Sequence, residues 1–168
     1  MSGVVPAALL VYAGCRWLDG RDGNHGPGLW WTIGHLAFLV AWVGFAALTV
    51  AMVRSLRATG AAAPVAGAAT LAGIGAFAWV TLTDLAPSWP DLPDPLRAVG
   101  PLLFLVGLMS LLALTARRRD SHWWPVFPLL ALAATAVVSA NLDLLAVAAL
   151  LFGAALLPCA RRPALSRG

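Results

Sequence analysis

Residues 29–53 form a run of 25 residues that contains no Asp, Glu, Lys or Arg. As an α-helix, with a rise of 1.5 Å per residue, this run would be about 37 Å long. The hydrocarbon core of a bilayer is roughly 30 Å thick, so a segment of this length and composition is expected to cross a membrane. The run therefore predicts a transmembrane helix, and with it a membrane protein.

The composition of the whole chain agrees with this prediction. Of its 168 residues, 61% are hydrophobic and 11% are charged, and the mean hydropathy is +0.85. Soluble domains carry about 25% charged residues. Every basic residue is Arg and every acidic residue is Asp. The dominance of Ala, Gly, Pro and Arg and the absence of Lys indicate a GC-rich bacterial genome. The net charge of +4 does not predict nucleic-acid binding, because the arginines stand at the ends of apolar runs, where they anchor membrane helices.

Six apolar segments are separated by loops or charges. The predicted helices cover residues 4–18, 29–53, 61–85, 98–116, 123–140 and 144–160. The segments between them at 19–28 and 86–95 are rich in Gly, Pro and Asp, which is typical of loops outside the membrane. The first run lacks the basic residues that precede a signal peptide's apolar core, so we expect a helix of the mature protein there, although it is short for a full span. The predicted fold is all-α: a polytopic membrane helical bundle in which residues 1–168 form a single transmembrane domain of six transmembrane helices with short loops.

The distribution of arginines predicts the orientation of these helices. With six spans, both termini and the connections near residues 54–60 and 117–122 fall on one side of the membrane. That side holds Arg54, Arg57, Arg117, Arg118, Arg119, Arg161, Arg162 and Arg167, and the other side holds Arg16, Arg21 and Arg97. Cytoplasmic loops carry the excess of basic residues. The sequence therefore predicts a multi-pass protein of the bacterial plasma (cytoplasmic) membrane with cytoplasmic N- and C-termini.

Two predicted helices carry stripes of small residues. Gly34, Ala37, Ala41, Gly44 and Ala51 share one side of the 29–53 helix, and Ala62, Ala66, Ala69, Gly73 and Ala76 recur at helical spacing in the 61–85 helix. Small side chains let helices approach closely within lipid. We therefore expect these two faces to pack against each other.

One polar cluster is a candidate binding site. His35 is the only histidine inside a predicted span, since His25 and His122 fall in loops on opposite sides. It lies six residues into its helix, about 9 Å below the outer surface. A buried imidazole needs a polar partner. The expected set is a shallow outer pocket for a small amphipathic or lipid ligand, formed by His35, Trp31, Trp79, Thr81, Asp84 and Trp89. Alternatively, His35 only bonds a helix backbone or Thr81 and joins two helices.

The sequence contains no recognisable catalytic, phosphate-binding or metal-binding motif, so we expect no cofactor and no metal. Cys15 and Cys159 fall on opposite sides of the predicted bundle, too far apart for a disulfide. The favoured interpretation is an integral membrane protein without enzymatic activity, serving as an accessory subunit or as a small-ligand-binding component. Its partners would be the lipid bilayer, a membrane protein or a second copy, and a small apolar ligand.

Two alternatives remain. A membrane-embedded enzyme could act on a lipid or isoprenoid, with His35 and Asp84 as acid and base. A small transporter with inverted repeats is suggested by a similarity between two segments. Arg21-Asp22, His25 and Trp30-Trp31 are echoed by Arg119-Asp120, His122 and Trp123-Trp124.

The pattern resembles small, uncharacterised six-helix membrane proteins of GC-rich bacteria. The resemblance rests on Trp30-Trp31-Thr32-Ile33-Gly34-His35, on Gly100-Pro101 with the apolar run to Leu108, and on the Arg run with tryptophans that follows. It implies the topology described above and no particular activity or functional residue.

Overall fold

The computed structural model describes residues 3–22, 26–118, 122 and 125–160, and these residues are almost entirely helical. They form α1 (Val4–Asp19), α2 (Leu29–Ser55), α3 (Ala62–Leu85), α4 (Asp94–Arg118), α5 (Val126–Ala140), α6 (Leu145–Ala155) and α7 (Leu157–Ala160), with short 3-10 turns η1 (Gly20–Asp22), η2 (Arg57–Thr59) and η3 (Leu142–Leu144). No β-strand occurs among the described residues. The predicted all-α class is therefore confirmed. Of the residues used above, His25, Arg119, Asp120, Trp123, Trp124, Arg161, Arg162 and Arg167 lie outside the described part of the chain.

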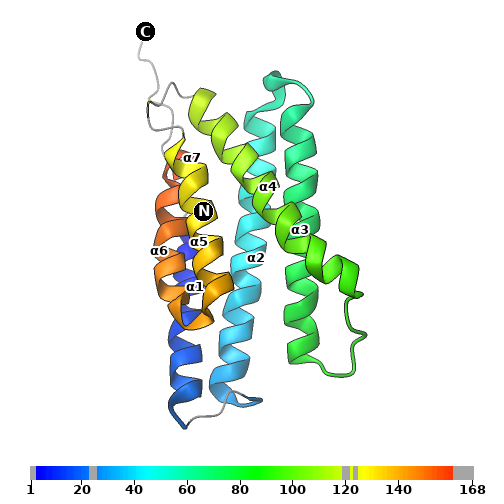
Figure 1. The fold of residues 1–168 in the computed structure, drawn as a ribbon, viewed down its shortest axis with the longest axis vertical. Coiled ribbons are helices and arrows are strands. Elements are labelled where there is room, and N and C mark those ends of the chain that lie inside the picture. The colour runs from blue at the N-terminus through cyan, green and yellow to red at the C-terminus, as the bar shows by residue number, and fades with distance from the viewer. Residues whose placement is uncertain (1–2, 23–25, 119–121, 123–124, 161–168) are drawn as a thin grey trace.

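Three helices are long and apolar enough to cross a membrane. α2, α3 and α4 have 27, 24 and 25 residues, with mean hydropathies of 2.4, 1.7 and 2.2 over their most apolar windows. The other described helices are shorter, since α1 has 16 residues, α5 has 15 and α6 has 11. In Figure 1, α5 and α6 accordingly cover only part of the height that α2 and α3 cover.

The start of α4 differs from the prediction. The helix begins at Asp94 rather than at residue 98, so the loop after α3 is shorter than expected. Pro95 fits the first turn, because the amide groups there lack partners within the helix. The Pro93 carbonyl accepts hydrogen bonds from Leu96 and Arg97 and starts the helical pattern.

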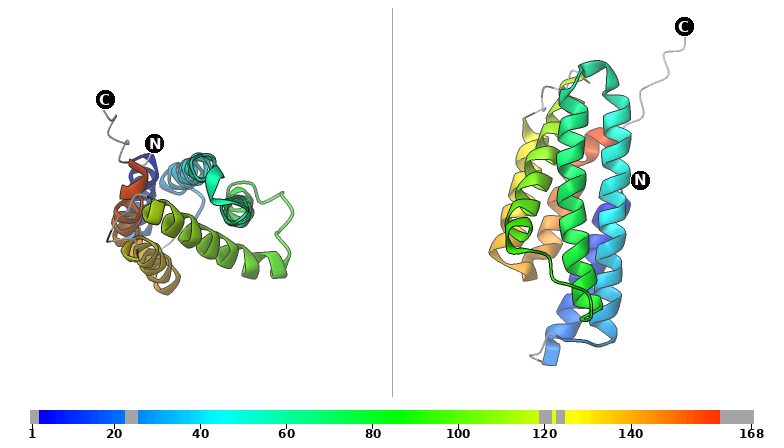
Figure 2. Two further views of the ribbon diagram at one scale, coloured as in Figure 1. Left: turned by 90° about the horizontal axis from the view of Figure 1, so that it is seen from above. Right: turned by 90° about the vertical axis from the view of Figure 1, so that its right-hand side faces the viewer.

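Helices α1 to α6 form a closed ring. Each packs against its neighbours in sequence, and α1 packs against α6 (Figures 1 and 2). Inside the ring, α2, α4 and α6 each contribute a buried phenylalanine, namely Phe45, Phe104 and Phe152. Their ring centroids lie 5.2 to 6.4 Å apart in edge-on arrangements, the geometry that aromatic rings favour. This aromatic cluster ties alternate helices of the ring together.

The closest helix contact joins α3 to α4 through glycines. A Cβ atom added to Gly73 would lie 2.6 Å from the Gly100 carbonyl oxygen and 2.6 Å from the Phe104 Cβ. One added to Gly107 would lie 2.6 Å from the Thr70 amide nitrogen. Real Cβ atoms do not come so close to backbone atoms, so only glycine allows this approach. The small face of α3 therefore packs on α4.

The prediction that the small stripe of α2 packs on α3 is wrong for the two glycines of that stripe. Gly34 faces Tyr12 and Cys15, and Gly44 faces Val5, all of them on α1. α2 does contact α3, but there the small residue is Gly67 of α3, against Val53. The physical reason is that α4 brings glycines of its own to α3 and can approach it more closely than α2 can.

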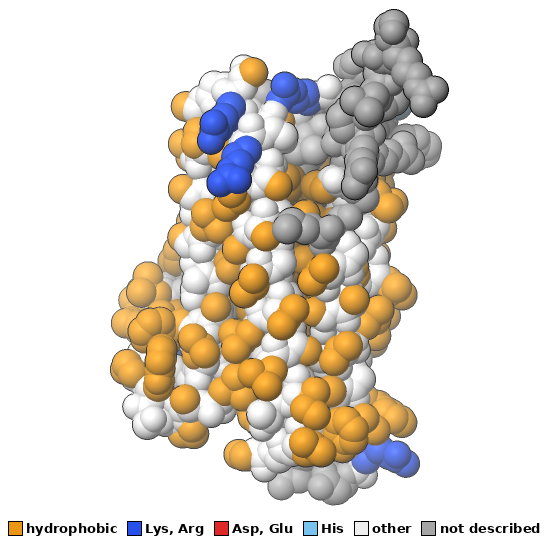
Figure 3. All heavy atoms as spheres, turned by 180° about the vertical axis from the view of Figure 1, so that it is seen from behind, with side chains coloured by type: hydrophobic (Ala, Val, Ile, Leu, Met, Phe, Trp, Pro, Cys, Tyr) orange, Lys and Arg blue, Asp and Glu red, His pale blue; other side chains and the backbone are white. Residues whose placement is uncertain are grey.

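Charged side chains gather at the two ends of the ring. The end where α2 and α4 finish, called here the arginine end, carries Arg54, Arg57, Arg117 and Arg118 among the described residues. The other end, called the aspartate end, carries Asp19, Asp84, Asp91, Asp94 and Asp143 together with Arg16, Arg21 and Arg97. Figure 3 shows the apolar side chains that cover the face between these ends. Cys15 lies near the aspartate end and Cys159 in α7 near the other, and no disulfide joins them.

The glycine contact leads to a stability prediction. Gly73→Ala should lower the free energy of unfolding by about 1–3 kcal/mol, because the new methyl group overpacks the α3–α4 interface. Gly75→Ala is the matched control, because nothing lies within 4 Å of its added Cβ. That variant should be neutral or slightly stabilised, since Ala favours helix over Gly. Unfolding of the detergent-solubilised protein measures both, and equal stability of the two variants would contradict the proposed contact.

Candidate functional site

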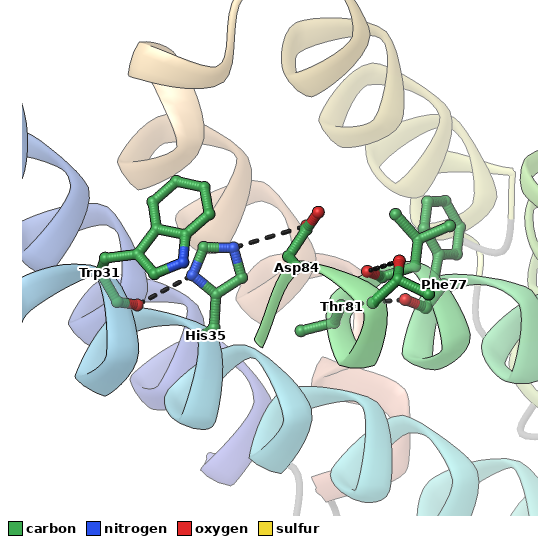
Figure 4. Close-up of polar contacts among 7 residues, drawn as sticks. Trp31, His35, Phe77, Thr81 and Asp84 are labelled. Atoms are coloured by element: carbon green, nitrogen blue, oxygen red, sulfur yellow. Dashed lines mark hydrogen bonds and ion pairs between the residues drawn. The ribbon is translucent and has the colours of Figure 1, made fainter. Parts of the chain in front are cut away.

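His35 lies in the second turn of α2 and is buried, with 3% of its surface exposed. Its Nδ1 is 2.8 Å from the Trp31 carbonyl oxygen of the preceding turn. Its Nε2 is 3.6 Å from Oδ2 of Asp84 at the end of α3. Figure 4 shows the imidazole between these two acceptors. The predicted contact between His35 and Asp84 is therefore present.

Both ring nitrogens of His35 face hydrogen-bond acceptors, so the number of N–H groups on the ring decides how many of these acceptors it can bond. A neutral imidazole has one N–H and one lone pair. In either neutral tautomer the lone pair therefore faces one of the two oxygens, that of the Trp31 carbonyl or that of the Asp84 carboxylate. The imidazolium has two donors and suits both acceptors at once. The contact is thus an ion pair when His35 is protonated.

Aromatic rings enclose the imidazole on its other sides. The Trp31 ring centroid lies 4.0 Å from that of His35, and the Tyr12 ring meets it edge-on at 5.6 Å. Tyr12 also stacks on Phe38 at 4.5 Å. Tyr12 was not predicted, although it is the only tyrosine in the chain. It reaches His35 because Gly34 lets α1 approach α2 closely.

The remaining predicted site residues lie elsewhere. Thr81 is buried, but its hydroxyl donates to the Phe77 carbonyl of its own helix at 2.9 Å, away from His35 (Figure 4). Trp79 donates its indole N–H to the Pro90 carbonyl at 3.0 Å, and its ring lies 5.5 Å from that of Trp89. The two tryptophans thus hold the loop after α3 against the helix. Of the six residues expected at one pocket, Trp31, His35 and Asp84 lie together, Trp79 and Trp89 form a second group, and Thr81 bonds only its own helix.

The space beside His35 is too small for a ligand. The cavity there, which Tyr12, Trp31 and Arg16 help to line, has a volume of about 10 Å³. A single water molecule needs about that much room. The geometry around His35 therefore resembles the alternative interpretation, in which the histidine joins helices.

A larger groove lies on the other side of Asp84, between α3 and α4. It has a volume of about 360 Å³, within the range of small-ligand pockets. Its apolar wall includes Phe77, Val80, Leu92 and Pro101. Its rim carries Asp84, Asp91 and Arg97, and Arg97 donates to Asp91 at 2.9 Å. We call it the α3–α4 groove.

Two of the three charged groups on this rim, Asp91 and Arg97, are not among the site residues predicted from the sequence. The signal was present, because Asp91 and Arg97 flank the proline-rich loop six residues apart. The start of α4 at Asp94 puts Arg97 within the first turn of the helix, where it can reach back to the loop. With the helix start placed at residue 98, that contact was not apparent.

A second, smaller cavity of about 190 Å³ lies at the end of α1, beside η3. Arg16 contacts Asp143 there at 3.3 Å, and the Arg21 guanidinium lies 5.3 Å from the Trp17 ring. The ion pair brings the turn between α5 and α6 next to the end of α1.

The described residues contain no group of three or more His, Cys, Asp or Glu side chains that could hold a metal ion. Comparison with known proteins finds no matching family model, no similar curated protein and no similar solved structure. What the chain can do has to be argued from its own geometry. That geometry offers a packed histidine and, beside it, an open groove with a charged rim.

A double-mutant cycle tests the contact at His35. We expect His35→Gln and Asp84→Asn to be coupled by about 0.5–3 kcal/mol of unfolding free energy, because each removes the partner of the other. His35→Gln and Thr81→Val should instead add to within about 0.5 kcal/mol, since Thr81 bonds its own helix. Chemical unfolding of the wild type, the three single variants and the two double variants measures both couplings. Stronger coupling to Thr81 than to Asp84 would refute the assignment.

Proposed function

We propose that this chain is an integral membrane protein that binds an amphipathic molecule from the lipid bilayer without changing it chemically. Three helices long and apolar enough to span a membrane support the location. The single observation that carries the binding role is the α3–α4 groove, which combines an apolar wall with a charged rim at one end of the bundle. A polar metabolite would contact the charged rim but not the apolar wall, whereas an amphiphile can contact both.

The same proposal includes six membrane crossings with both termini in the cytoplasm of a bacterium. The Arg16–Asp143 contact supports it, because the turn between α5 and α6 then lies at the same end as the finish of α1. The arginine end would face the cytoplasm, where basic residues accumulate and meet anionic lipid. The α3–α4 groove would then open at the external surface. The shorter helices α1, α5 and α6 would cross where flanking residues and the local bilayer adapt to them.

We favour binding over catalysis because a substrate cannot reach the imidazole of His35. A general acid or base has to come within hydrogen-bond reach of its substrate. The imidazole of His35 is enclosed by aromatic rings, and both of its nitrogens already face protein acceptors. The transporter alternative gains no support either. α1–α3 have 16, 27 and 24 residues, whereas α4–α6 have 25, 15 and 11.

Filling the groove tests the proposal. Val80→Trp places a large ring against the apolar wall, and we expect it to reduce bound amphiphile several-fold. Val65→Trp is the matched control, because Val65 is on the same helix, 67% exposed and outside the groove. Native mass spectrometry of the purified protein with added phospholipid counts the molecules that stay bound. Equal retention by the two variants, or no phospholipid bound to the wild type, would contradict the proposed function.

A further inference from the structure

We propose that the α3–α4 groove selects a phospholipid headgroup with a primary ammonium, of the phosphoethanolamine type. The ammonium would lie between Asp84 and Asp91, and the phosphate would bind Arg97. This inference rests on the proposed function and names the class of amphiphile. It follows from the charges on the groove rim.

The rim presents two carboxylates and one guanidinium from three different segments. Asp84 belongs to α3, Asp91 to the loop and Arg97 to α4. A zwitterionic headgroup has the complementary pattern, since one phosphate and one ammonium are separated by two carbons. A purely anionic headgroup would satisfy Arg97 but would place no cation on the carboxylates.

The existing contacts leave these groups able to bind a ligand. Arg97 donates one N–H to Asp91, and a guanidinium has five N–H groups, so other donors of Arg97 can bind a ligand. That ion pair is solvent-exposed, with 47% of the Arg97 side chain and 81% of the Asp91 side chain accessible. Exposed pairs contribute little, so a ligand can rearrange this one. Asp84 turns Oδ2 toward His35, which leaves its second oxygen for another partner.

Hydrogen-bond donors decide between the zwitterionic headgroups. A primary ammonium has three N–H groups, which form strong charge-assisted bonds to carboxylates. A choline headgroup carries a quaternary ammonium without any N–H, and such cations are recognised by aromatic cages instead. The rim offers carboxylates, not a cage. The groove therefore favours ethanolamine over choline.

The depth of the groove suits a lipid that stays in the bilayer. Phe77 lies two helical turns from Asp84, about 10 Å further into the membrane. Between the two levels, Val80 and Pro101 line the groove. The headgroup would occupy the rim while the glycerol and the first acyl carbons lie along this apolar wall. Its volume of about 360 Å³ accommodates that portion of a lipid, with the acyl tails continuing into the bilayer.

The test measures dissociation constants of three phospholipids that share their acyl chains. Phosphatidylethanolamine, phosphatidylcholine and phosphatidylglycerol are titrated separately into the purified full-length protein in detergent and followed by native mass spectrometry. We expect phosphatidylethanolamine to bind at least fivefold more tightly than the other two. Mono- and dimethylated ethanolamine lipids should fall in between, in order of their remaining N–H groups. Soluble phosphoethanolamine at equal concentration should not compete, because it lacks the acyl chains.

Variants assign the contacts. Asp91→Asn and Asp84→Asn should each abolish the preference for ethanolamine over choline. Arg97→Gln should instead weaken the binding of phosphatidylethanolamine and of phosphatidylcholine to a similar degree. His35→Gln should keep the preference, which separates the ligand contact of Asp84 from its contact with His35. Asp143→Asn, in the smaller cavity, is the matched control and should change nothing. Circular dichroism and gel filtration confirm that each variant is folded.

The outcomes separate the two proposals. If the three phospholipids bind equally, and Val80→Trp still removes them, the headgroup inference is wrong while the binding function stands. Retention of the ethanolamine preference in Asp91→Asn and Asp84→Asn would also overturn the headgroup inference. Competition by soluble phosphoethanolamine at equal concentration would overturn the assignment to a membrane lipid. Absence of any phospholipid binding would refute both proposals.

Discussion

The backbone contact between α3 and α4 is the interaction on which the rest of the structure depends. Gly73 meets the α4 backbone near Gly100, and Gly107 meets α3 near Thr70. In Figure 1, α4 crosses α3 at a steep tilt and reaches α5 at its far end, which helps to close the ring. Toward its start, α4 leads away from the end of α3, and the α3–α4 groove lies there. One close contact thus shapes both the bundle and its candidate site.

Several polar side chains within the helices bond to their own helix, whereas the buried Trp42 Nε1, Thr49 Oγ1 and Thr115 Oγ1 have no hydrogen-bond partner among the described residues. Thr70, Thr81 and Thr135 each donate to the carbonyl four residues earlier in the same helix. His35 likewise uses the Trp31 carbonyl of its own helix, and its second nitrogen faces Asp84. Such bonding removes the penalty of a lone polar group in an apolar surrounding. Asp84 differs from these side chains, because it faces the histidine on one side and lines the groove on the other.

Much of the helical order could be predicted from the sequence, whereas the neighbours of each helix face could not. Apolar runs bounded by Gly, Pro and charges are local signals, so the sequence predicts the all-α class and the long helices. The contact of His35 with Asp84 could also be predicted, because Asp84 ends the next helix at a similar depth. The small face of α3 can pack on any helix that carries glycines, and in the structure it packs on α4 rather than on α2. Tyr12 reaches His35 only through packing, which no spacing in the sequence reveals.

The most direct test of the account is whether the two ends of the ring lie on opposite sides of a membrane. In a background with Cys15→Ala and Cys159→Ala, Asp91→Cys marks the loop beside the α3–α4 groove and Ala58→Cys marks the connection between α2 and α3. A membrane-impermeant maleimide should label Asp91→Cys in intact bacterial cells, and Ala58→Cys only after the membrane is permeabilised. Labelling of both positions from outside would show that α3 does not cross. The reverse pattern would place the groove in the cytoplasm and contradict the proposed orientation.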